Sequence, residues 1–172
     1  MLYSTNSHPR RYPVKNVDIE SILSRERTYS SLAAASKKKA IEEAAQRIAE
    51  AGTDLNAEKI FESLISREKI GTTAIGHGIA IPHCRVENCN SIMGSLFRLD
   101  APVDFDAYDD EPVRILCVLL VPADEVEDHL KALGLLASRF ESSEYRDRLL
   151  LAKNDEELYS AAVADIGNAR SA

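Results

Sequence analysis

Two histidines and two cysteines lie close together in the stretch GHGIAIPHCRVENC, which spans positions 76–89. Proteins use these residue types as nucleophiles, proton carriers and metal ligands. His83 is the most informative of them, because a neutral imidazole has one nucleophilic nitrogen while a hydrogen bond fixes the other. Three alternatives follow for His83: a loop histidine without a chemical role, a metal ligand, or a catalytic or phosphoryl-accepting histidine.

A metal site would use His77, His83, Cys84 and Cys89 as ligands. The spacing H-x5-H-C-x4-C is irregular, whereas structural zinc sites show paired ligands at regular spacing. In addition, the adjacent His83 and Cys84 cannot readily direct both side chains at one ion. We therefore expect no metal and no other cofactor, and keep a metal-binding protein as the least favoured alternative.

The apolar residues before His83 place it at a predicted strand end. The run GIAI predicts a short strand that ends at Pro82, which cannot donate a hydrogen bond to a sheet ladder. His83 would then stand just after this strand, where ligand sites form in open α/β sheets. Rigid backbone would hold the ring while leaving it accessible.

Two helices are predicted before this strand. Apolar residues at helical spacing indicate a helix over 36–51, with Ser36 as its N-cap and Gly52 at its end. A second helix is predicted over 56–66. Many apolar positions of the first helix are alanines, which allows close packing against a neighbouring element.

Strands are predicted by three short aliphatic runs, at 78–82, 91–99 and 113–122. The last run is apolar almost throughout, which indicates a central strand covered on both faces. Helices then return: one after Asp124, which forms a predicted capping box with Glu127, and two more over 143–151 and 154–164. This order predicts an α/β fold, a single-domain sandwich with a central mixed β-sheet flanked by helices.

The composition is that of a globular protein, since 45% of the 172 residues are hydrophobic and 28% are charged. We expect one domain over 17–166, a flexible N-terminal arm over 1–16 and a short tail over 167–172. No apolar run approaches the roughly 20 residues of a membrane helix, and the N-terminus lacks the apolar core of a signal peptide. The sequence therefore predicts a cytoplasmic protein without membrane insertion.

Charge and cysteine content exclude two further classes of protein. The formal net charge of -7 argues against a broad nucleic-acid surface. The three cysteines, Cys84, Cys89 and Cys117, are an odd number that fits reduced thiols better than a disulfide framework. Cys117 lies inside an apolar run and is expected to be a core residue.

The stretch SREKIGTTAIGHGIAIPHCRVENC resembles the phosphorylation-site motif of fructose/mannitol-type (type 2) enzyme IIA domains of the bacterial phosphoenolpyruvate phosphotransferase system. The resemblance is strongest to the nitrogen-related, PtsN-like branch. It covers about residues 17–163 in order, and it includes SILSRERTYSSLAAASKKKAIEEAA before the motif, then PVDFDAYDDEPVRILCVLLVPADEVEDHLKALGLLASRF and NDEELY after it. It therefore implies the fold of these domains for nearly the whole chain.

The resemblance assigns roles to three residues. His83 matches the histidine that receives the phosphoryl group from a phosphorylated HPr-like carrier, and His129, in EDHLKAL, matches a second histidine that orients or stabilises the first. Arg67 matches an arginine of the active-site region, and a guanidinium suits phosphate oxygens. Thr72 and Thr73 are expected to add hydroxyl donors. Without the resemblance, His129 would be a histidine at the edge of the core and Arg67 a solvated charge.

The sequence departs from the pattern of this branch at three positions. The branch typically has GNGIAIPHG, whereas this chain has His77 in place of the asparagine and Cys84 in place of the last glycine. Ala74 also stands where glycine is usual. A side chain at Cys84 is expected to remove backbone freedom next to His83 and so to alter the docking of the carrier. His77 would bring a titratable ring close to the site.

The resemblance implies a histidine phosphocarrier of a regulatory phosphotransferase system. Its phosphorylation state would control the binding of target proteins, such as transporters or sensor kinases. No permease, enzyme IIB-like or HPr-like domain is apparent in the chain, which favours regulation over direct sugar uptake. The main alternative is a binding module with the same fold that no longer transfers phosphate.

Overall fold

Strand β6 (Val113–Pro122) is the centre of a mixed sheet, as its apolar sequence predicts. In the computed structural model, which describes residues 17–165, every residue of β6 except Arg114 is buried. β6 pairs antiparallel with β5 (Met93–Val103) and parallel with both β3 (Ile79–Ala80) and β4 (His83–Val86). The sheet is completed by β1 (Thr28–Leu32), parallel to β5, and by β2 (Ala74–Gly76), antiparallel to β3.

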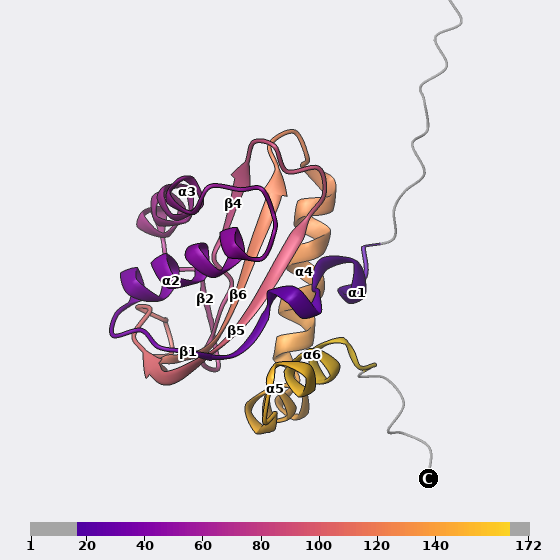
Figure 1. Cartoon of the computed structure of the whole chain (residues 1–172). Helices are drawn as coiled ribbons and strands as arrows, with labels where there is room; N and C mark the ends of the chain where they lie inside the picture. Colours follow the sequence, from indigo (N-terminus) through magenta and orange to yellow (C-terminus); the bar gives the residue numbers. More distant parts are fainter. Residues whose placement is uncertain (1–16, 166–172) are drawn as a thin grey trace, which may run out of the picture.

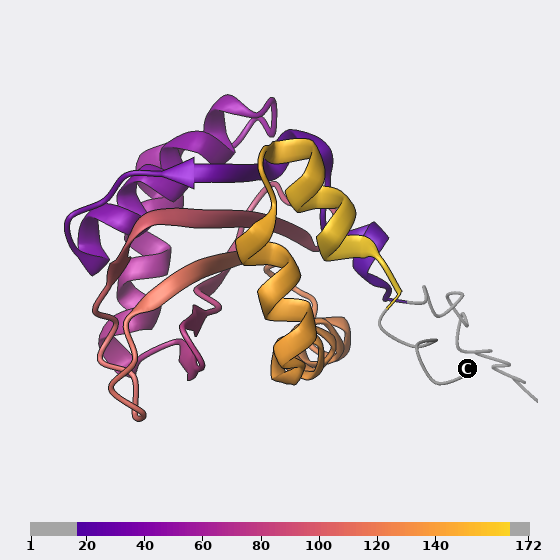
Figure 2. The ribbon, with the colours of Figure 1, turned by 90° about the horizontal axis from the view of Figure 1, so that it is seen from below.

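Helices cover both faces of this sheet (Figures 1 and 2). Two of them, α2 (Lys37–Glu50) and α3 (Ala57–Ile70), pack on one face around a core that includes Phe97 and Phe105. The other face is covered by four helices: α1 (Ile19–Ile22), α4 (Glu127–Glu141), α5 (Ser143–Leu151) and α6 (Asp155–Val163). The predicted sandwich with a mixed sheet flanked by helices is thus confirmed.

Two predicted helix starts are confirmed by their caps. The Ser36 hydroxyl accepts a hydrogen bond from the backbone N–H of Lys39 at 3.2 Å, at the start of α2. The Asn154 side chain accepts from the N–H of Glu157 at 2.8 Å, at the start of α6. Each cap satisfies one of the free N–H groups of the first helical turn, which is why these residues mark helix starts in a sequence.

The predicted capping box at the start of α4 is wrong. α4 begins at Glu127, its N-cap is Val126, and no side chain caps it. Asp124 lies in the turn after β6, two residues before the N-cap, so its carboxylate is not at the position that reaches the first helical N–H groups. The first turn of α4, which contains His129, therefore has no side-chain cap.

The predicted strand before His83 is interrupted. β3 ends at Ala80 and β4 begins at His83, and both run parallel to β6. Between them, the carbonyl of Pro82 still accepts a hydrogen bond from the N–H of Leu119 at 2.9 Å. His83 is thus the first residue of a second strand, and not a loop residue beyond the last one.

The predicted arm over 1–16 and tail over 167–172 lie outside the described residues, and so does residue 166 of the predicted domain. Among residues 17–165, no helix combines the length and apolar character needed to cross a membrane.

Candidate phosphoryl-acceptor site

A pocket of about 640 Å³ opens between α3, β4 and the start of α4. The pocket brings together His83, Arg67, His129 and Cys84, which sequence analysis selected from separate parts of the chain. It is also lined by Glu62, Ser63, Ser66, Ile70 and Arg85. Helix α3, on one face of the sheet, and helix α4, on the other, thus both border the strand that carries His83.

The half-buried His83 ring is held by the backbone just before it. Its Nδ1 lies 2.8 Å from the carbonyl oxygen of Ile81, and because a carbonyl can only accept, we assign the proton to Nδ1. Burial lowers the pKa of His83; the hydrogen bond to Ile81 opposes this change and the charge of Arg67 adds to it. The ring is therefore neutral near pH 7, and its unprotonated nitrogen is Nε2.

His129 faces His83 from the third residue of α4. The two ring centroids are 5.4 Å apart, and the ring planes make an angle of 61°. Nε2 of His129 is buried without a hydrogen-bond partner among the described residues. Burial lowers the pKa of His129, and the charges of His83 and Arg85 lower it further. A buried ring nitrogen without a partner is the kind of group that a bound ligand can satisfy.

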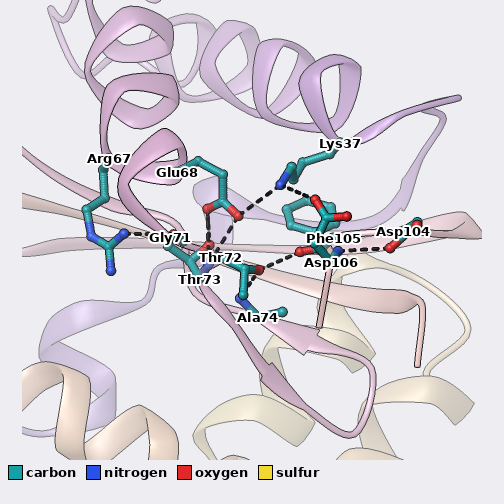
Figure 3. Close-up of polar contacts among 10 residues, drawn as sticks. All are labelled: Lys37, Arg67, Glu68, Gly71, Thr72, Thr73, Ala74, Asp104, Phe105 and Asp106. Atoms are coloured by element: carbon teal, nitrogen blue, oxygen red, sulfur yellow. Dashed lines mark hydrogen bonds and ion pairs between the residues drawn. The ribbon is translucent and has the colours of Figure 1, made fainter. Parts of the chain in front are cut away.

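Arg67 lies in the last turn of α3, where its Nη1 donates to the carbonyl of Gly71 at 2.9 Å (Figure 3). A guanidinium has five N–H donors in a planar fork, so one such bond orients the group and leaves donors for an anion. Arg67 is near enough to His83 for its charge to lower the pKa of that ring. The predicted trio of His83, His129 and Arg67 is therefore assembled in one pocket.

Arg85 is a pocket residue that sequence analysis missed. It is exposed and follows His83 by two positions in β4, and alternate residues of a strand point to the same face. It lines the pocket and lowers the pKa of His129. The alternation of side chains would have selected it, but His83 had been predicted to follow a strand and not to begin one.

Thr72 and Thr73 do not line the pocket, and their hydroxyl groups are used elsewhere (Figure 3). The Thr72 hydroxyl donates to the carbonyl of Phe105, and the Thr73 hydroxyl donates to the carboxylate of Glu68. In this structure the two residues fix the loop that leads from α3 to β2, and they offer no donor to a group bound at His83.

His77 lies outside the pocket, in the turn between β2 and β3. Its φ is 58°, in the left-handed region, and its backbone N–H donates to the carboxylate of Asp109 at 2.8 Å. Asparagine adopts this conformation more readily than most residues, which gives a physical reason for the asparagine typical of the branch. The structure does not bring the His77 ring to His83.

Cys84 forms part of the pocket wall but has only 8% of its surface exposed. It lies in extended β4, a conformation that any residue adopts, so its side chain causes no backbone strain next to His83. Burial raises the pKa of its thiol to about 12, which keeps the thiol protonated.

The four-residue metal cluster does not form. His77 and Cys89 are not pocket residues, and the Cys89 thiol donates to the carbonyl of Ser91 at 2.9 Å. Across residues 17–165 there is no group of three or more histidine, cysteine, aspartate or glutamate side chains placed to hold a metal ion. The structure therefore does not bring these four residues together as one metal site.

Comparisons with known proteins agree on one family. Residues 20–162 match the family model described as "Phosphoenolpyruvate-dependent sugar phosphotransferase system, EIIA 2". The "Nitrogen regulatory protein" of Pseudomonas aeruginosa is 43% identical over 152 residues, which cover 88% of this chain and 98% of that protein.

Solved structures give the same result. The nitrogen regulatory protein IIA-Ntr from Neisseria meningitidis is 34% identical, with a TM-score of 0.76 over 82% of this chain and 96% of that one. The IIA mannitol protein from Escherichia coli shares the fold at 20% identity, with a TM-score of 0.68 over 81% of this chain and 97% of that one. The chain belongs to the EIIA 2 family of the phosphoenolpyruvate-dependent sugar phosphotransferase system, in its nitrogen-regulatory branch.

Proposed function

We propose that the protein is a histidine phosphocarrier that accepts a phosphoryl group on His83 from a phosphorylated HPr-like protein. The main support is the pocket in which a neutral His83, fixed through Nδ1, faces both His129 and Arg67. Such an arrangement supplies a nucleophile and a cation for the phosphoryl oxygens. The family membership supports a role in phosphoryl transfer, and the residue roles are our assignment.

In the proposed step, the Nε2 lone pair of His83 forms a bond to phosphorus. The bond between phosphorus and the donor atom of the carrier breaks, and its electron pair stays with the carrier. The ring keeps its Nδ1 proton and becomes positively charged, and the Ile81 carbonyl stabilises this charge as a hydrogen-bond acceptor. Arg67 neutralises the phosphoryl oxygens, and the buried Nε2 of His129, carrying the ring proton, gains a partner when it donates a hydrogen bond to one of them.

The surroundings of the pocket suit a protein donor. Ile70 lines the pocket and has 83% of its surface exposed, and Leu130 and Val126, which lie close to His129 in the sequence, have 67% and 55% exposed. Large exposed apolar side chains around a polar site are typical of surfaces that bind other proteins. A phosphoryl group on His83 would place negative charge beside this surface, so the same contacts could bind a target in one state and release it in the other.

We propose that the switch acts in the cytoplasm on target proteins such as transporters or sensor kinases. Within the described residues, Cys84, Cys89 and Cys117 are free thiols, as expected in a reducing compartment.

The test is intact-mass measurement after incubation with phosphoenolpyruvate, enzyme I and an HPr-like carrier, for the wild type and His83→Ala. One added phosphoryl group, labile in acid and absent from the variant, is the expected result. No mass gain with several cognate carriers, in a folded protein, would contradict the proposal and favour a binding module that does not transfer phosphate.

A further inference from the structure

Glu68 follows Arg67 in α3 but does not line the pocket, and its side chain points toward Thr73 and Lys37 (Figure 3). Its side chain is only 3% exposed, and an acidic residue is rarely buried to this degree unless its charge is paired. The proposed transfer step makes no direct use of this carboxylate. Its contacts show what it holds in place.

The Glu68 carboxylate accepts hydrogen bonds from two groups of Thr73, in the loop that follows α3. The backbone N–H of Thr73 donates to both carboxylate oxygens, at 3.1 and 3.2 Å, and the Thr73 hydroxyl also donates to it. On the other side, Nζ of Lys37 lies 3.5 Å from the carboxylate and 2.9 Å from the carboxylate of Asp106 (Figure 3). Glu68 thus ties the end of α3 to the start of α2 and to the loop after β5.

From Thr73, backbone hydrogen bonds lead directly to His83. The carbonyl of Thr73 accepts from the N–H of Ile81 at 3.0 Å, and the carbonyl of Ile81 accepts from Nδ1 of His83 at 2.8 Å. The position of the Ile81 carbonyl, which fixes the His83 tautomer, therefore depends on the position of Thr73. Glu68 fixes that position.

A second connection leads from the same loop to Arg67. The carbonyl that orients the Arg67 guanidinium belongs to Gly71, two residues before Thr73. When Glu68 holds Thr73, it also restrains the Gly71 carbonyl. The orientations of His83 and Arg67 therefore both depend on this loop.

We propose that Glu68 is a positioning residue for phosphoryl transfer: through Thr73 it fixes the carbonyl groups that orient His83 and Arg67. The inference rests on the proposed function for its catalytic consequence. Its structural consequence, the tautomer of His83, can be measured without any phosphoryl donor. The tautomer also separates a positioning role from mere stabilisation, because a residue that only adds stability leaves the His83 tautomer unchanged in the folded protein.

The first experiment compares Glu68→Gln with the wild type by long-range ¹H–¹⁵N NMR of the imidazole rings, at a pH where His83 is neutral. The carboxamide keeps the size of the side chain, but its NH₂ group cannot accept from Thr73 or from Lys37. We expect His83 to be almost entirely Nδ1–H in the wild type, and the Nε2–H form to rise to about a third or more in the variant, since an equilibrium needs only a small free-energy change to shift this far. Glu58→Gln, on the exposed start of α3, should keep the wild-type tautomer.

The second experiment measures the rate of His83 phosphorylation by phosphoramidate, which needs no protein partner. In this reaction the P–N bond of phosphoramidate breaks, ammonia leaves, and a new bond forms to Nε2 of His83. We expect Glu68→Gln to lower the rate by about tenfold or more, because small displacements of a reacting group have effects of this size. Glu68→Asp should recover part of the rate.

The outcomes separate the two proposals. A folded Glu68→Gln protein with the wild-type tautomer would overturn the positioning role, whatever the rate. If Glu68→Gln does not fold, Thr73→Val keeps the backbone bond and removes only the hydroxyl, and an unchanged tautomer together with an unchanged phosphoramidate rate in this variant would also overturn it. If the wild type itself is not phosphorylated by carrier or phosphoramidate, the proposed function fails, but a shifted tautomer in Glu68→Gln would still support the link from Glu68 to His83.

Discussion

His83 and His129 meet edge to face at 5.4 Å between ring centroids, with one ring fixed by a backbone carbonyl and the other lacking a partner for its buried Nε2. One histidine is thus fixed by its surroundings, while the other retains unused hydrogen-bonding capacity. A phosphoryl group bound to the first ring would lie where the second can reach it.

Replacement of His129 by leucine should separate stability from function. A buried polar atom without a partner costs about 1–3 kcal/mol, so His129→Leu should leave the free energy of unfolding unchanged or raise it. The rate of phosphorylation of His83 should fall by about 100-fold, the usual effect of losing one transition-state donor. Urea unfolding and timed intact-mass measurements give the two quantities. A large loss of stability with an unchanged rate would show that His129 is a packing residue; Lys131→Leu, on the exposed part of α4, is the control.

The two rings should also make stability depend on pH. Burial lowers the pKa of both His83 and His129, whereas imidazoles of an unfolded chain take up protons near pH 6.5. Below that pH the unfolded state binds more protons than the folded state, so the free energy of unfolding should decrease as the pH falls through about 6.5. Above about pH 6.5 both states hold the two rings neutral, so the free energy of unfolding no longer changes with pH through these histidines.

Urea unfolding between about pH 7.5 and about pH 5.5 measures this effect, since the range spans the ordinary imidazole pKa. The double variant His83→Gln/His129→Gln should lose less stability over the range than the wild type does. Equal losses in the two proteins would contradict the lowered pKa values.

Arg85 should act on the pocket through its charge. This charge lowers the pKa of His129, so Arg85→Ser should raise the pKa of His129, as followed by NMR titration. If the carrier approaches with a negatively charged phosphoryl group, the variant should also show a weaker dependence of the transfer rate on salt. Arg114→Ser removes an exposed arginine on β6 that does not line the pocket, and it should change neither quantity. Equal effects of the two variants would show only a general dependence on net charge.

Prediction from the sequence succeeded where one local signal determines a structure. The short apolar run of β6 indicates a buried strand, and Ser36 and Asn154 mark helix starts through contacts within a single turn. It failed where the structure depends on distant contacts. Strand β1 (Thr28–Leu32) was missed because TYSSL has no clear alternation and exists through its pairing with β5. The Asp124 box failed because the turn after β6 sets the start of α4.

The site shows the same division between local and distant information. The motif around His83, with the resemblance that it carries, selected the three residues that meet in the pocket. It could not show that Thr73 bonds to Glu68, because that contact depends on how the loop closes onto α3. The motif also could not show that His77 lies outside the pocket, because His77 is close to His83 in the sequence. Only the turn between β2 and β3 places it elsewhere.

The turn at His77 gives a final prediction about stability. Gly76, His77 and Gly78 have φ values of 90°, 58° and 76°, so this turn contains three successive residues with positive φ, and His77 is the one that is not glycine. Asparagine tolerates this region through local hydrogen bonds of its short side chain, whereas β-branched residues are strained there. His77→Asn should therefore raise the free energy of unfolding by up to about 1 kcal/mol, and His77→Val should lower it by about 1–2 kcal/mol. Urea unfolding of the three proteins measures both changes. The free energy of unfolding should be highest with asparagine, intermediate with histidine and lowest with valine. Any other order would show that side-chain contacts at position 77 outweigh the preference for its backbone conformation.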